Sequence, residues 1–154
     1  MTEPLPKDLE PVVQAVEIAA PPAHVFELFV DPAQLVRWWP DAARIEPRLG
    51  GRIELEFEGR GDVAGEITRF EPPHGLAFTW VRGVAPDVTT YVDVTISDLG
   101  EGRTRVELVH SGWEAVPADQ VAEWRALHDA GWRFFLGCLA GLAEGRPVDK
   151  SWGG

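Results

Sequence analysis

The chain has 154 residues, 45% of them hydrophobic, and a formal net charge of -11. The length fits a single domain, and the apolar fraction is too high for a disordered chain. The acidic balance argues against nucleic acid and anionic membranes as partners, because both need clustered lysines and arginines.

The first elements are marked by proline. Residues 1–11 hold three prolines and several charges, and we interpret them as a flexible N-terminal arm. A strand is predicted over 12–18. A short helix over 23–30 follows Pro21 and Pro22, and a second begins at Asp31 and Pro32, an N-cap and a first-turn proline, and runs through residue 38.

From residue 45 onward the apolar period changes to two, which predicts strands. The clearest case is 52–58, where Ile53, Leu55 and Phe57 share one face and carboxylates the other. Opposite parity of Ile67 and Phe70 predicts a bend or bulge in the next strand. The predicted strands are 45–49, 52–58, 63–70, 76–80, 88–96 and 104–110. Together with 12–18 they suggest an antiparallel sheet of six or seven strands with one solvent-exposed face.

A long helix is predicted over 117–144, because its apolar residues recur every three or four positions. Gly145 stands where a helix C′ residue belongs, with Pro147 two positions later. At 1.5 Å per residue the helix measures roughly 40 Å, enough to cross the sheet. We therefore predict an α+β domain over 12–146, in which a curved antiparallel sheet grips this helix and leaves an apolar pocket. Residues 147–154 form a C-terminal tail whose Trp152 could pack on a neighbouring molecule, so a homodimer is possible.

Several segments also carry a family resemblance in their order and spacing. These are residues 16–26 (VEIAAPPAHVF), 35–40 (LVRWWP), 47–52 (PRLGGR), 65–67 (GEI), 72–80 (PPHGLAFTW), 104–113 (TRVELVHSGW) and 128–132 (HDAGW). In this arrangement the chain resembles the START-like superfamily (SRPBCC, helix-grip fold), and within it the family of the activator of Hsp90 ATPase homologue 1. The resemblance covers about residues 12–145.

The resemblance implies a helix-grip fold and a cavity for a lipid, polyketide, hormone or other hydrophobic small molecule. Some members are cyclases or hydrolases. The chaperone activity of the eukaryotic namesake involves a further N-terminal domain that this chain does not contain, so we do not expect it here.

Candidate ligand-binding residues are those expected to face the interior from the sheet and from the closing helix. They are Trp38, Trp39, Phe57, Phe78, Trp80, His110, Trp124, His128, Gly131 and Trp132. Either Trp38 or Trp39 could instead anchor the short helices to the sheet. An aromatic stripe of this kind is also typical of an ordinary core.

His110 ends the inward-facing series Thr104, Val106, Leu108, so it is expected in the interior. It could contact a ligand or act as an acid or base. It could also be satisfied structurally, by a backbone carbonyl or by His128. Gly131 costs up to about 1 kcal/mol in a helix interior, which suggests close packing or room for a ligand.

No catalytic constellation, metal site or cofactor is predicted: the serines lack a nucleophile-elbow context, and Cys138, the single cysteine, lies on the helix's apolar side. The leading hypothesis is binding of a small hydrophobic or amphipathic molecule. An enzyme of the polyketide cyclase or hydrolase type and a domain that interacts with a chaperone or regulator are the alternatives. Without a signal peptide or a membrane span of about 18 apolar residues, a cytoplasmic location is expected.

Overall fold

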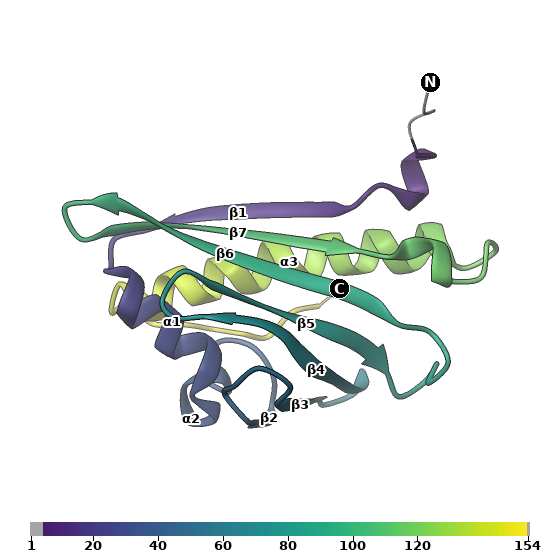
Figure 1. The fold of residues 1–154 in the computed structure, drawn as a ribbon, viewed down its shortest axis with the longest axis horizontal. Helices are drawn as coiled ribbons and strands as arrows, with labels where there is room; N and C mark the ends of the chain where they lie inside the picture. The colour runs from purple at the N-terminus through teal and green to yellow at the C-terminus, as the bar shows by residue number, and fades with distance from the viewer. Residues whose placement is uncertain (1–4, 154) are drawn as a thin grey trace.

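The computed structural model describes residues 5–153 (Figure 1). Of the predicted N-terminal arm, residues 1–4 lie outside the described part, and a short 3-10 helix, η1 (Lys7–Leu9), lies within it. In the described part of the chain, helices are too short or too polar to cross a membrane.

The α+β fold is confirmed: seven antiparallel strands form one curved sheet. Its order is β1-β7-β6-β5-β4-β3-β2, so every neighbour except the β1–β7 pair is also a neighbour in sequence. The strands are β1 (Val12–Ile18), β2 (Ala42–Ile45), β3 (Arg52–Phe57), β4 (Gly61–Glu71), β5 (Gly75–Arg82), β6 (Thr90–Gly100) and β7 (Arg103–Ser111).

Two short helices connect the opposite edges of this sheet. They are α1 (Pro22–Val30) and α2 (Pro32–Leu35), and both begin with proline, whose fixed φ suits a first helical turn. The Asp31 carboxylate accepts a hydrogen bond from the Ala33 amide at 2.9 Å, which confirms the predicted N-cap. The prediction that α2 continues through residue 38 was wrong, because the chain leaves α2 through tight turns after Leu35.

Several strand boundaries differ from the prediction, most clearly those of β2 and β6. The segment predicted as 45–49 pairs earlier, as β2, and β6 begins two residues later than expected and extends to Gly100. The predicted irregularity in β4 is confirmed by a register shift between Ile67 and Arg69. Such shifts bend a strand and increase its twist, and here they help to curl the sheet around the helix.

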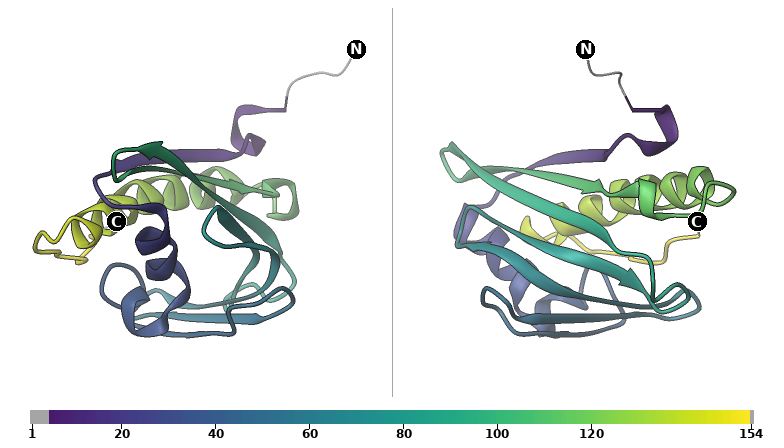
Figure 2. Two further views of the ribbon diagram at one scale, coloured as in Figure 1. Left: turned by 60° about the vertical axis from the view of Figure 1, so that its left-hand side comes forward. Right: turned by 45° about the vertical axis from the view of Figure 1, so that its right-hand side comes forward.

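The long helix α3 (Val121–Ala143) crosses the concave side of the sheet (Figure 2). It has 23 residues, fewer than predicted, because residues 117–120 form a turn instead of a first helical turn. Gly145 adopts φ 75°, which confirms it as the residue that ends the helix. A second short 3-10 helix, η2 (Trp113–Ala115), lies between β7 and α3.

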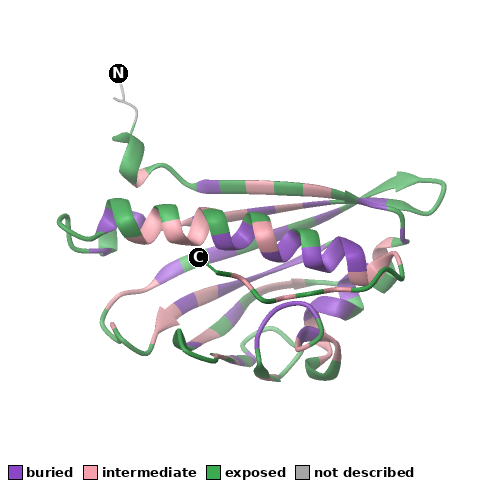
Figure 3. Cartoon of the chain, turned by 180° about the vertical axis from the view of Figure 1, so that it is seen from behind, coloured by how far each residue is buried: buried purple, intermediate pink, exposed green. Residues whose placement is uncertain are grey.

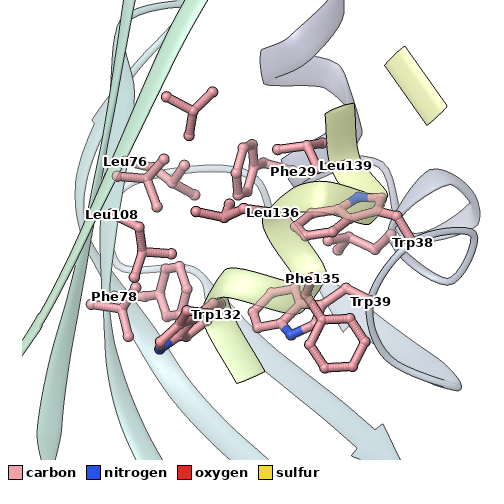
Figure 4. Close-up of a cluster of buried hydrophobic side chains, with 14 of the residues drawn as sticks. Phe29, Trp38, Trp39, Leu76, Phe78, Leu108, Trp132, Phe135, Leu136 and Leu139 are labelled. Carbon is pink, nitrogen blue, oxygen red and sulfur yellow. The ribbon is translucent and has the colours of Figure 1, made fainter. Parts of the chain in front are cut away.

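A cluster of buried hydrophobic side chains lies where α1, the residues after α2 and the C-terminal half of α3 meet the sheet (Figure 4). Trp38 is fully buried there, donates its indole N–H to the Leu28 carbonyl at 2.9 Å and packs edge-on against Phe29. Leu136 and Leu139 face it from α3. The buried residues of α3 are concentrated in this half of the helix (Figure 3).

The C-terminal tail folds back along α3 (Figure 3). The Lys150 ammonium donates to the carbonyls of Val36 and Pro40, at 2.5 and 2.7 Å, which fixes the tail to the loop after α2. Trp152 lies over Gly131 and packs against Phe134 and Phe135 of the same chain.

Candidate functional site

A cavity of about 350 Å³ lies between the N-terminal half of α3 and the sheet. Trp39, Trp80 and Trp132 form its deep wall, with centroid distances of 5.9 Å from Trp39 to Trp80 and 5.1 Å from Trp39 to Trp132. Exposed residues of the β3–β4 hairpin stand at its mouth. The full lining is Trp39, Phe57, Gly59, Arg60, Gly61, Asp62, Val63, Trp80, Arg82, Val84, Leu127, His128, Gly131, Trp132, Phe135 and Trp152.

Six of the ten predicted site residues belong to this lining: Trp39, Phe57, Trp80, His128, Gly131 and Trp132. The other four lie elsewhere. Trp38 is in the core described above, Phe78 is buried beside Trp39 and Trp80, and His110 is fully buried behind the wall. Trp124 borders a small adjoining crevice, which shares Trp80, Arg82 and His128 with the cavity.

Two histidine–tryptophan hydrogen bonds connect α3 to the sheet behind this wall. Trp132 of α3 donates its indole N–H to Nδ1 of His110 on β7 at 3.0 Å. In the opposite direction, Trp80 of β5 donates to Nε2 of His128 on α3 at 3.2 Å. The two imidazoles pack edge to face, 5.2 Å apart.

These bonds fix both histidines as neutral tautomers, because an indole N–H can only donate. His110 therefore carries its proton on Nε2 and donates it to the Thr90 hydroxyl at 2.7 Å. His128 carries its proton on Nδ1 and donates it to the Trp124 carbonyl at 2.7 Å.

The pKa values of both groups agree with neutral rings. Burial lowers the pKa of His110 well below 6.5, and the nearby His128 lowers it further. For His128, loss of hydration and the charge of Arg82 lower the pKa to about 4, although the bond to the Trp124 carbonyl opposes the shift.

All four ring nitrogens thus have partners within the fold, which favours the structural interpretation of His110. Its partners are Thr90 and Trp132, so the expectation that a backbone carbonyl or a hydrogen bond from His128 would satisfy it was wrong. Neither ring offers a free nitrogen for acid–base chemistry. Among residues 5–153, no three histidine, cysteine or carboxylate side chains are grouped to hold a metal ion.

At position 131 glycine lies directly beneath the C-terminal tail. A Cβ atom at Gly131 would stand 3.1 Å from the Trp152 ring, closer than ordinary van der Waals contact. The missing side chain at Gly131 leaves room for the Trp152 ring against α3. The Arg60 guanidinium lies 4.3 Å from the centre of the Trp152 ring, in a cation–π contact at the cavity mouth.

Sequence reasoning missed two arginines of the lining, Arg60 and Arg82. For Arg82 a signal was present, because it continues the inward-facing series Leu76, Phe78, Trp80 by one more alternation. Arg60 lies in a hairpin turn, where alternation gives no direction, so only the fold could place it at the cavity.

Comparison with solved structures finds the same fold in several proteins. DynU16, a protein from the dynemicin biosynthetic locus, is 26% identical with a TM-score of 0.74; the match covers 94% of this chain and 51% of DynU16, so the chain spans about half of its length. MLL2253 from Mesorhizobium loti is 23% identical, with a TM-score of 0.75 and coverage of 86% and 96%. The Aha1 dimer from Colwellia psychrerythraea is 19% identical, with a TM-score of 0.73 and coverage of 87% and 96%.

A search of curated proteins returned no match. The family model described as "Activator of Hsp90 ATPase homolog 1-like protein" matches residues 19–144, from the end of β1 to the end of α3. That span includes every strand of the meander, both short helices and all ten candidate residues. The chain belongs to this family of activator of Hsp90 ATPase homolog 1-like proteins.

Proposed function

We propose that this protein binds a small hydrophobic or amphipathic molecule in the cavity between α3 and the sheet. The observation that carries the proposal is the cavity itself, whose volume of about 350 Å³ lies within the ~300–1,000 Å³ range of small-molecule sites. Its deep wall is aromatic, and rigid aromatic side chains bind apolar molecules at a low cost in conformational entropy.

The arrangement favours binding over catalysis. His110 and His128, the two histidines of the interior, have every ring nitrogen engaged by tryptophan, threonine or backbone partners. Asp62, the acidic residue of the lining, is exposed at the mouth, away from the deep wall. A cyclase or hydrolase would need a group aimed at the reacting atoms, and these contacts do not supply one.

The test uses the fluorescent apolar probe 1-aminoanthracene and two variants of adjacent residues on α3. Leu127→Trp fills the cavity from its lining, and Ala126→Trp adds the same ring on the exposed neighbouring position. We expect wild type and Ala126→Trp to bind the probe one to one, with a blue-shifted emission and a raised melting temperature. Leu127→Trp should bind at least about tenfold more weakly, since the probe and the added ring compete for one space.

Equal binding by all three proteins would place the probe outside the cavity and contradict the proposal. Circular dichroism and melting temperature without the probe check that both variants are folded.

A further inference from the structure

Arg82 stands out among the arginines of this acidic chain. It is the last residue of β5, lines the cavity and is half-buried. Its guanidinium stacks 4.4 Å above the Trp124 ring, but within the described residues it makes no hydrogen bond and no ion pair. A stacked guanidinium keeps its N–H edge available, because stacking uses only its face.

Five other arginines of the described residues are paired with carboxylates: Arg48, Arg52, Arg69, Arg105 and Arg146. Arg69, also on the sheet, lies 2.6 Å from Asp93 and 3.5 Å from Glu71, and Arg52 lies 2.5 Å from Glu54. With 25 acidic residues in the sequence, a carboxylate partner for Arg82 would be easy to provide. Asp62 also belongs to the cavity lining, yet its carboxylate is not within ion-pair distance of Arg82.

The position of the guanidinium suits the head group of a bound molecule. Trp80, two residues before Arg82 on the same face of β5, belongs to the deep aromatic wall, so the charge lies beyond the apolar part of the cavity. Arg60 adds a second positive charge at the mouth, where it is held against Trp152. In a partly desolvated site a cation interacts with an anion more strongly than it does in water.

Burial lowers the pKa of the Arg82 guanidinium, and no carboxylate opposes the effect. The same charge contributes to the lowered pKa of His128, so it acts on the interior of the site.

We infer that the ligand is a monocarboxylic acid with an apolar body, whose carboxylate is bound by Arg82 while the body lies against Trp39, Trp80 and Trp132. This inference rests on the proposed function and narrows it to a ligand class. The planar guanidinium fork matches the two oxygens of a carboxylate and forms charge-assisted hydrogen bonds with them.

The experiment compares two probes of nearly equal shape, 2-naphthaleneacetic acid and 2-naphthaleneacetamide, by calorimetry at pH 7.5. We expect wild type to bind the acid roughly tenfold or more tightly than the amide, as one charge-assisted contact would give. Arg82→Gln should lose this preference, because its affinity for the acid should fall much further than its affinity for the amide. Arg82→Lys, which keeps the charge without the fork, should retain part of the preference.

The matched control is Arg44→Gln, which removes an exposed arginine of β2 outside the cavity lining and should keep the full preference for the acid. Equal binding of the acid and the amide by wild type, or an unchanged preference in Arg82→Gln, would overturn the inference and leave the cavity proposal standing. If wild type binds neither naphthalene probe and does not bind 1-aminoanthracene, both this inference and the cavity proposal are overturned. Melting temperatures of the variants establish that a lost preference does not come from unfolding.

Discussion

The two halves of α3 face the same sheet but have different surroundings. From Gly131 to Gly141 most inward residues are buried, among them Leu136 and Leu139, in contact with the core that α1 and α2 complete. None of residues 122–130 is buried, and Leu127 and His128 line the cavity instead. The difference teaches that α1 and α2 fill one end of the curved sheet, whereas among residues 5–153 no further α-helix besides α3 covers the other end, where the cavity lies.

The largest difference between the halves should appear on truncation of a leucine in each. Leu139→Ala removes a fully buried side chain and should lower the free energy of unfolding by about 2–5 kcal/mol, since the packed surroundings cannot close the gap. Leu127→Ala removes a partly exposed one beside existing empty space and should cost less than about 1 kcal/mol. Urea denaturation of both variants measures the contrast, and equal losses would contradict it.

Acid should lower the free energy of unfolding through the two histidines beside the cavity. The His128 pKa is about 4 in the folded protein against 6.5 ordinarily, so below pH 6.5 the unfolded chain binds a proton that the folded chain refuses. Stability therefore falls as the pH drops from about 6.5 to 4, by up to roughly 3 kcal/mol from this group, and His110 acts in the same direction.

The measurement is the free energy of unfolding between pH 4 and 8. In His128→Gln, whose amide oxygen can accept the Trp80 N–H, the slope between pH 6.5 and 4 should be smaller than in wild type. Ala126→Gln changes an exposed residue of α3 without adding or removing a titratable group, and serves as the control with an unchanged slope. If His128→Gln had the same slope as wild type, the loss of stability in acid could not be attributed to His128.

The hydrogen bonds between α3 and the sheet should contribute an intermediate amount. Trp132→Phe keeps an aromatic ring but leaves buried Nδ1 of His110 without a donor, which should cost about 1–3 kcal/mol. Trp124→Phe is the control, because within the described residues its indole N–H makes no hydrogen bond. Denaturation curves in which the control loses as much stability as Trp132→Phe would argue against this role.

The smallest effect concerns the tail on the surface of α3. With Trp152 present, Gly131→Ala should leave the free energy of unfolding unchanged or lower it, since the added Cβ would lie 3.1 Å from the Trp152 ring. In a Trp152→Ala background the same change should stabilise by up to about 1 kcal/mol, because alanine is the better helix former. A double-mutant cycle measures this coupling, and additive effects would show that the tail does not explain the glycine.

Much of this fold was predictable because its signals are local. Alternation placed His110 and Trp80 inward, and proline and glycine marked where the helices begin and end. The helix boundaries that failed, at the C-terminal end of α2 and at the start of α3, depend on hydrogen-bonded turns that resemble helix in composition. The site was predicted in part, since inward residues of a sheet can face either core or cavity and alternation cannot distinguish the two.

By itself the sequence determined which residues face the interior, because side-chain direction follows from strand and helix periods alone. Tertiary structure decided what each interior residue meets. It paired Trp132 with His110 and Trp80 with His128, laid Trp152 over Gly131, and left Arg82 stacked on Trp124 without a carboxylate. These outcomes depend on contacts between segments far apart in the chain, and no local period encodes such contacts.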